Sequence, residues 1–184
     1  MAAIATAEDA LTDAVGATGS RFVLHWGEMG TRWGVSRTVA QIHALLYMLG
    51  RPMHAEEIAE ILQVARSNVS NSLRELQNWD LVKVVHLAGD RRDHFDTAQD
   101  PWELMRIILR ERKEREIDPT VAFLNSCVAS RDFAREDAQT QKRLRDMLAL
   151  LEAGSAWGDD MLKLETGVLK KLLKLGARVQ AMLR

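Results

Sequence analysis

The chain has 184 residues, of which 47% are hydrophobic and 28% are charged, and its formal net charge is −1. This composition is ordinary for a soluble globular protein and allows one sizeable core. It excludes a general electrostatic attraction to nucleic acid, so any DNA contact must come from locally placed Arg and Lys. The single cysteine, Cys127, excludes an internal disulfide and favours a reducing, cytoplasmic location.

The N-terminal part of the chain is predicted to be helical. From about Ala7 to Trp33, apolar residues recur at helical spacing and indicate one buried stripe: Phe22, Trp26, Met29 and Trp33. Glycines at positions 16, 19, 27, 30 and 34 argue against an unbroken helix there. The acidic start does not resemble a secretory signal, and no apolar run is long enough to span a bilayer. We therefore expect no membrane partner.

The central part combines three helices with a short β-rich segment. A helix is predicted from about Ser36 to Leu49, with Gly50 as its C-terminal cap. The segment AEEIAEIL forms a short third helix, and after a tight turn a fourth helix runs from about Ser67 to Trp79. The β-branched run LVKVVHL, the polar turn AGDRRD and the segment HFDT then predict a β-hairpin.

The C-terminal part is again helical. Asp100 and Pro101 form a typical helix start, and the same pattern recurs at Asp118 and Pro119. A further helix is predicted from about Glu136 to Glu152 and ends at Gly154. Ser155 then caps a last helix that reaches almost to Arg184.

The order of the central elements predicts a winged helix-turn-helix fold. Helix, short helix, tight turn, helix and hairpin follow one another between about Ser36 and Thr97. The fold class is therefore mainly α with a small β-wing, plus terminal dimerisation helices. We expect an N-terminal helical dimerisation segment at 1–35, a DNA-binding domain at 36–98 and a C-terminal dimerisation arm at 99–184.

The fourth helix has one apolar and one polar side. The apolar side would pack it against the third helix through Val64, Val69, Leu73 and Leu76. The polar side presents Ser67, Asn71, Arg74 and Asn78, flanked by Asn68 and Ser70. In the major groove, Asn can pair with adenine and Arg with guanine. A merely solvated face is the alternative, but such faces prefer Glu and Lys, because Ser and Asn cost helix stability.

The hairpin tip supplies a second candidate DNA contact. Arg91 and Arg92 lie where a wing would reach the sugar-phosphate backbone or the minor groove. Asp90 and Asp93 flank them, so one arginine can instead be held by an acid; we favour Arg92 for DNA and leave Arg91 open. The candidate DNA-binding residues are therefore Arg66, Ser67, Asn68, Ser70, Asn71, Arg74, Arg91 and Arg92.

These motifs resemble the MarR superfamily, and within it the GbsR-like branch. The resemblance covers Ile42 to Thr97 and rests on EEIAEILQVARSNVSNSLRELQNWDLVKVV, the wing GDRRDHF and the upstream GRPMHAEEIA. It implies a homodimeric repressor or activator that often responds to a small molecule. Where relatives commonly have Ser or Thr to start the recognition helix, this chain has Ala65, which cannot cap, so Ser67 or a backbone group must compensate.

The last predicted helix has the pattern of a dimerisation surface. Met161, Val168 and Leu175 repeat every seven residues, with Leu172 and Val179 at the companion positions. Such a wide apolar stripe needs a partner, which is the chain's own first helix, a second subunit or both. A homodimer would present two recognition helices to the half-sites of a pseudo-palindromic DNA site about one helical turn apart.

Other features carry weaker hypotheses. Trp26, Trp33, Tyr47 and Trp102 could line a pocket for a small-molecule effector, such as a quaternary ammonium ligand, although scattered aromatics more often form core. The histidines do not have metal-ligand spacing and no catalytic motif is present, so we assign no metal, no cofactor and no enzymatic activity. The alternative function is a winged-helix module that binds protein without contacting DNA directly.

Overall fold

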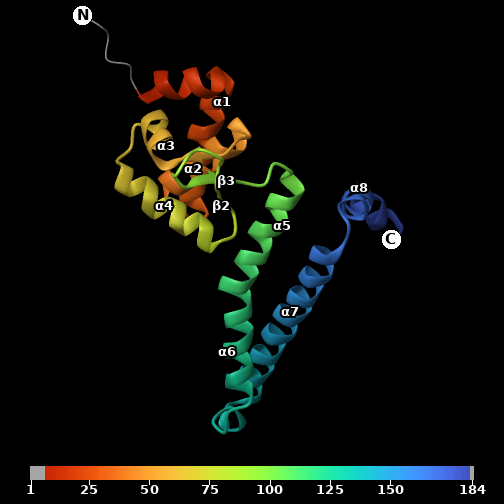
Figure 1. Cartoon of the computed structure of the whole chain (residues 1–184). Coiled ribbons are helices and arrows are strands. Elements are labelled where there is room, and N and C mark those ends of the chain that lie inside the picture. The colour runs from red at the N-terminus through yellow and green to blue at the C-terminus, as the bar shows by residue number, and fades with distance from the viewer. Residues whose placement is uncertain (1–6, 183–184) are drawn as a thin grey trace, which may run out of the picture. The chain divides into compact units, whose positions relative to one another are not determined.

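The computed structural model describes the backbone of residues 7–182 and the side chains of residues 8–173 and of Leu175 (Figure 1). The chain divides into two compact units, with the boundary between Ile107 and Ile108. In the described residues, the first unit holds four complete helices, a small sheet and the first part of a fifth helix, and the second is helical. The expected fold class, mainly α with a small β-wing, is confirmed.

The first unit is built on helices α1 (Ala7–Arg32), α2 (Arg37–Leu49), α3 (Ala55–Leu62) and α4 (Arg66–Asn78). Its core consists of side chains that are almost completely buried: Val23, Val39, Ile42, Leu45, Leu46, Ile58, Val69, Leu73 and Leu76. Each of the four helices contributes to this list, which follows the apolar periodicity of the sequence. Burial of these side chains supplies the main driving force for seating α4 on its neighbours.

The glycines of α1 have two different structural roles. Gly16 has φ 75° and ψ 165°, so it kinks the helix, as the glycine content predicted. Gly30 instead permits close packing, because a Cβ placed there would lie 2.5 Å from Cβ of Ala40 on α2. The expectation that the glycines interrupt the helix is therefore correct at Gly16, whereas Gly30 lies within it.

The ends of α2 follow the sequence prediction. Oγ of Ser36 accepts a hydrogen bond from the Val39 N–H at 3.2 Å, and Gly50 adopts φ 61° and donates its N–H to the Leu46 carbonyl. The bounds of α3 match the predicted segment AEEIAEIL, but its cap was not predicted: Nδ1 of His54 lies 3.3 Å from the backbone nitrogen of Glu57, at the N-cap position. Histidine is an uncommon N-cap residue, so the usual preference for Ser, Thr, Asp and Asn did not indicate it.

The wing is a three-stranded antiparallel sheet with the order β1-β3-β2. The predicted hairpin is formed by β2 (Lys83–Val85) and β3 (His94–Asp96), with Val84 opposite Phe95. The sequence did not predict β1 (Met53–His54), which is too short to show a period-2 pattern. Through β1, the start of α3 is joined directly to the wing.

The boundary between the units falls within α5 (Pro101–Arg112), whose residues from Ile108 onwards belong to the second unit. The second unit continues with a π-helical turn (Lys113–Ile117), α6 (Asp118–Val128), a 3₁₀ turn (Phe133–Arg135), α7 (Ala138–Lys163) and α8 (Thr166–Met182). The predicted start of α5 is confirmed, because Oδ1 of Asp100 accepts from the Trp102 N–H at 3.0 Å. The predicted helix start at Asp118 matches the first residue of α6, but the predicted capping role of Asp118 is wrong. Asp118 is itself helical, and its carboxylate binds Nζ of Lys113 at 2.8 Å and the Ser155 hydroxyl at 3.2 Å.

The predicted helix break at Gly154 is also wrong. α7 continues through Gly154 to Lys163, and Ser155 lies within the helix rather than at a cap. A single glycine costs only about 1 kcal/mol relative to alanine, which helix packing readily exceeds. The break occurs instead at Leu164, which has extended φ and ψ of −67° and 141°.

This break divides the expected dimerisation stripe. Met161 lies in α7, whereas Val168, Leu172 and Leu175 lie in α8, so the repeat does not follow one continuous helix. The side chains of Val168, Leu172 and Leu175 are between 41% and 44% exposed. The side chain of Val179 lies outside the described ones. An apolar set therefore remains exposed on α8, although its geometry differs from the predicted long stripe.

Candidate nucleic-acid interface

Helix α4 has two distinct faces, as the sequence predicted. Val69, Leu73 and Leu76 are at most 1% exposed and anchor the helix in the core, while Val64 in the preceding turn is half-buried. On the opposite face the side chains of Ser67, Asn71, Arg74 and Asn78 are exposed. These donors and acceptors are therefore held on a rigid element with no large apolar group among them, a surface suited to reading base edges.

The N-terminus of α4 begins at Arg66, one residue before the predicted start. As expected, Ala65 at the N-cap position makes no side-chain capping hydrogen bond. Ser67 does not replace it, because the hydrogen bonds at this end come from the backbone: the Asn68 and Val69 N–H groups donate to the Ala65 carbonyl at 2.9 and 3.1 Å. The start of the recognition helix thus lacks the usual side-chain cap.

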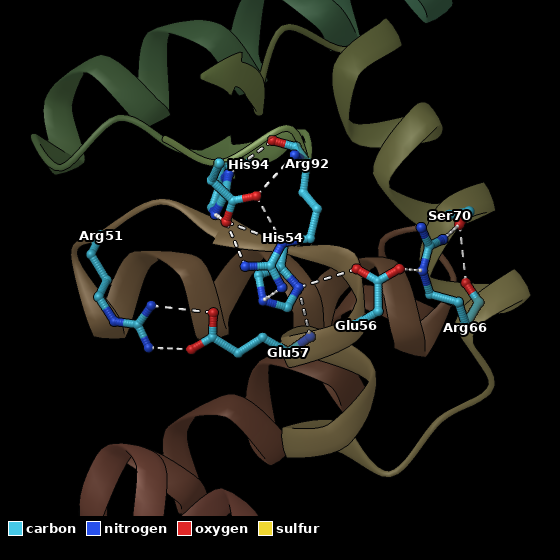
Figure 2. A network of polar contacts seen from close by, with 9 residues as sticks. Arg51, His54, Glu56, Glu57, Arg66, Ser70, Arg92 and His94 are labelled. Atoms are coloured by element: carbon cyan, nitrogen blue, oxygen red, sulfur yellow. Dashed lines mark hydrogen bonds and ion pairs between the residues drawn. The ribbon is translucent and has the colours of Figure 1, made fainter. Parts of the chain in front are cut away.

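Side chains near this end of α4 are tied to neighbouring helices. Nε of Arg66 donates to Oε1 of Glu56 on α3 at 2.7 Å, and its guanidinium also contacts the Ser70 hydroxyl (Figure 2). Nδ2 of Asn68 lies 3.3 Å from the Thr38 hydroxyl on α2. Hydrogen bonding to Arg66 lowers the pKa of Glu56 to about 2, so this carboxylate is ionised at neutral pH.

Further along the helix, Arg74 is less restrained. Its Nη1 donates to Oδ1 of Asn71 at 3.2 Å, and both side chains are exposed. The two residues with the clearest base-pairing chemistry therefore lie together one turn apart. Bidentate pairing of Arg with guanine or Asn with adenine requires this kind of accessible, preorganised group.

The two wing arginines have different surroundings. Nε of Arg92 donates to both oxygens of Asp90, at 2.9 and 3.1 Å, and its Nη1 lies 2.9 Å from Nε2 of His54. The guanidinium holds the pKa of Asp90 well below its usual range. Arg91 is exposed and makes no hydrogen bond or ion pair with any residue in the described part of the chain. The arginine restrained by an acid is thus Arg92, and Arg91 is the accessible one.

A pocket of about 290 Å³ lies between α4 and the wing. Its lining includes Leu73 and Phe95 and the charged or polar side chains of Glu56, Arg66, Ser70, Arg74, Arg92 and Asp93. Three arginines from two elements therefore border one depression beside the exposed face of α4. Two carboxylates, Glu56 and Asp93, border the same depression, so its lining carries charges of both signs.

Two of the four residues predicted to line an aromatic pocket are in ring contact. The rings of Trp26 and Trp33 meet edge to face at 5.2 Å, and Trp26 also contacts Phe22 at 5.4 Å. Tyr47 lies on α2 and Trp102 on α5. None of the four lines the pocket between α4 and the wing.

The sequence did not indicate His54, Glu56 and His94 as parts of this site. A usable signal was the spacing of His54 and Glu57, which matches that of a capping box with histidine at its first position. Among the described residues, no group of three or more His, Cys, Asp or Glu is placed to hold a metal ion, and no helix could cross a membrane.

Comparisons with known proteins agree with this geometry. Residues 28–93 match the model of the MarR family. The HTH-type transcriptional repressor GbsR of Bacillus subtilis (strain 168) is 25% identical over 97 residues, which are 53% of each chain. The repressor OpcR of the same organism is 27% identical over 71 residues, 39% of this chain and 38% of OpcR. The chain thus matches about half or less of these relatives' lengths.

A solved structure described as a transcriptional regulator has the same fold. The two structures superpose with a TM-score of 0.64 at 20% identity, over 79% of this chain and 95% of the other. The matched family region runs from the end of α1 to the wing and includes all of α4. Residues 28–93 therefore match the MarR family and lie in a winged helix-turn-helix, and the chain is similar to GbsR.

Proposed function

We propose that this chain is a DNA-binding transcriptional regulator rather than an enzyme. The observation that carries the proposal is the exposed polar face of α4, held rigidly by its buried apolar face beside an arginine-bordered pocket. A helix of this kind fits the major groove. The relatives named above, which are transcriptional repressors, support the same function.

The site residues divide into two roles in this proposal. Ser67, Asn71 and Arg74 read base edges, because their side chains are exposed on one helix face. The others position the protein on the sugar-phosphate backbone, where contacts carry no direct sequence information: Arg66, Asn68, Ser70, Arg91 and Arg92. Because Arg91 is accessible, we assign the main phosphate contact of the wing to it. Arg92 is paired with Asp90 and would contact a phosphate only when it leaves that pair.

The proposed regulator is a homodimer that reads a pseudo-palindromic site. The segments at 1–35 and 99–184 would hold the two copies together, with Met161, Val168, Leu172, Leu175 and Val179 in the contact. Support comes from Val168, Leu172 and Leu175, which stay exposed on α8 although they are apolar. Two-fold symmetry would place the two recognition helices on half-sites about one helical turn apart.

A small-molecule effector completes the proposal. A ligand bound among Trp26, Trp33, Tyr47 and Trp102 would alter the spacing of the recognition helices by a population shift. The edge-to-face contact of Trp26 and Trp33 supports an aromatic surface on α1. Each ring also has a simpler role as part of the packing of its helix.

Selection of bound duplexes from a random pool tests the central claim. We expect enrichment of a sequence with two related half-sites at a constant spacing. Failure to enrich any sequence, together with no retention on duplex DNA at low salt, would contradict DNA binding. That result would favour the alternative function, a protein-binding winged-helix module, for which the net charge of −1 is the specific supporting observation.

A further inference from the structure

His54 lies at the junction between α3 and the wing, and each of its ring nitrogens has a partner. Nδ1 lies 3.1 Å from Oε2 of Glu56 and 3.3 Å from the backbone nitrogen of Glu57. Nε2 lies 2.9 Å from Nη1 of Arg92 (Figure 2). The side chain of His54 is only 16% exposed, so water competes weakly for these positions.

The protonation of the ring decides which of these contacts can form. A guanidinium only donates, so Nε2 must offer its lone pair to hold Arg92, and the hydrogen of the neutral ring is then on Nδ1, where it donates to Glu56 and cannot also accept from the Glu57 N–H. A protonated ring has hydrogens on both nitrogens. It keeps the bond to Glu56 but loses the bond to Arg92, and it places two cations 2.9 Å apart.

Protonation of His94 would also weaken the contacts that hold Arg92. Its Nδ1 lies 3.0 Å from the Arg92 carbonyl, to which it donates, and its Nε2 lies 3.6 Å from Oδ2 of Asp90. When the ring is protonated, Nε2–H can donate to the same carboxylate that holds Arg92. The rings of His54 and His94 meet edge to face at 5.5 Å, so the two histidines form one cluster around the base of the wing.

The carboxylates of the cluster stay ionised near neutral pH. Arg66 lowers the pKa of Glu56 to about 2, and hydrogen bonds from Arg51 and Arg92 lower the pKa values of Glu57 and Asp90. The charged groups that contact the two rings or these acids are Glu56 and Glu57 on α3, Arg66 on α4, Asp90 and Arg92 on the wing, and Arg51 before β1. Histidine is the group whose charge ordinarily changes between pH 5 and 8.

We propose that His54 and His94 form a proton-operated latch on the wing, which holds the Arg92 side chain when both rings are neutral and releases it when they are protonated. The release follows from two effects, loss of the acceptor on His54 and competition from His94 for Asp90. His54 is a positioning residue in this device, because it acts through Arg92.

The latch would change DNA binding, and this consequence rests on the function proposed above. Arg92 borders the pocket between α4 and the wing. While Asp90 and His54 occupy its guanidinium, Arg92 contributes little net charge to a DNA contact. Once released, it adds one cation beside the recognition helix. Duplex binding should therefore gain about one phosphate contact on acidification.

NMR of arginine side chains measures the latch without DNA. The Nε–Hε signal of Arg92, assigned from its loss in Arg92→Lys, is expected at pH 7.5 to differ from that of the exposed Arg91. Between pH 7.5 and 5.5 it should move towards the Arg91 position, with a midpoint that coincides with the titration of the His54 and His94 rings. An Arg92 signal that stays unchanged over this range overturns the proposal.

A non-titrating variant separates the latch from a general pH effect. In His54→Asn the new side chain can cap α3, since Asn is a strong N-cap residue. Unlike histidine, it cannot be protonated. We expect the pH-dependent movement of the Arg92 signal to fall by at least half. His25→Gln, which removes an exposed histidine of α1, should leave the movement unchanged. An equal movement in wild type and His54→Asn overturns the proposal.

A second variant and a DNA measurement complete the test. Asp90→Asn removes one of the two anchors, so at pH 7.5 the Arg92 signal should lie closer to that of Arg91 than in wild type, while the neutral His54 ring still accepts from Arg92. In wild type the salt slope of duplex binding should steepen by about one between pH 7.5 and 5.5, and in His54→Asn it should steepen less. Absence of duplex binding at both pH values would overturn the proposed function, while the arginine signal would still decide the latch.

Discussion

Nε of Arg66, the first residue of α4, lies 2.7 Å from Oε1 of Glu56 in the first turn of α3. This ion pair connects the N-termini of the two helices that make up the helix-turn-helix. Both side chains are about half exposed, so the pair contributes at most about 1 kcal/mol to stability. Its more important effect in the proposed function is on the charge available beside α4, because Glu56 neutralises an arginine that we assign to the phosphate backbone.

Glu56→Gln should therefore strengthen duplex binding. The substitution removes one negative charge and frees Arg66, so we expect a steeper salt slope, by about one, and a loss of unfolding free energy below about 1 kcal/mol. Binding isotherms at several salt concentrations measure the slope. The matched control is Glu60→Gln, which removes the same charge from an exposed position of the same helix. Equal effects of both variants would show that Arg66 is not involved.

Arg74→Ala should weaken binding to the selected sequence and relax its specificity. If Arg74 pairs with a guanine edge, the loss is about 1–3 kcal/mol on the specific site and much smaller on scrambled DNA. Competition titrations with the two duplexes measure the difference. Arg143→Ala, which removes an exposed arginine of α7, controls for net charge. An equal loss on both duplexes would assign Arg74 to the phosphate backbone instead.

His43 should make the folded state less stable in acid. It is buried on α2, its Nε2 has no hydrogen-bond partner within residues 7–182, and burial lowers its pKa from 6.5 to about 4. Between pH 6.5 and 4 the unfolded chain therefore binds more protons than the folded one, so stability falls as the pH is lowered through this window. The shift corresponds to roughly 3 kcal/mol in full.

Urea unfolding at pH 7.5 and pH 5 measures this loss. His43→Leu should show a smaller decrease between the two pH values than wild type, because a leucine takes up no proton. His25→Gln should behave as wild type, since His25 is exposed. A decrease in His43→Leu as large as that of wild type would assign the acid sensitivity to other groups.

Two glycine substitutions should have opposite effects on stability. Gly30→Ala places a Cβ 2.5 Å from that of Ala40, so overpacking between α1 and α2 should cost about 1–3 kcal/mol. Gly154→Ala meets no atom within 4 Å inside the continuous helix α7, and it should gain about 1 kcal/mol from helix propensity. Thermal unfolding of the two variants measures both signs. A stabilising Gly30→Ala would contradict the close packing of α1 on α2.

Leu172→Glu should weaken the proposed homodimer. Leu172 is apolar and 41% exposed on α8, so a partner surface would bury it, and a buried unpaired carboxylate is costly. Sedimentation velocity over a concentration series measures the dissociation. Lys171→Glu changes the charge at a neighbouring exposed position of the same helix and should leave the dimer intact. An unchanged dimer in Leu172→Glu would place Leu172 outside the contact.

Local sequence patterns were sufficient for most of the central fold. The cap residues Ser36 and Gly50, the apolar side of α4 and the hairpin around the GDRRD turn all follow from interactions within a few residues. The exposed face of α4 followed as well, because a helix with one buried side must present the other to solvent. Helical periodicity and turn chemistry are properties of short segments, so they can be read without knowledge of the rest of the chain.

Tertiary structure decided the rest, through contacts between residues distant in the sequence. The pairing of Arg92 with His54 joins positions 38 residues apart, and Asp118 bonds Ser155 across 37 residues. Local rules therefore assigned Asp118 and Ser155 to caps and left the partners of Arg92 undetermined. A charged or hydroxyl side chain takes the best partner that the folded chain brings within reach, and local sequence rules do not specify that partner.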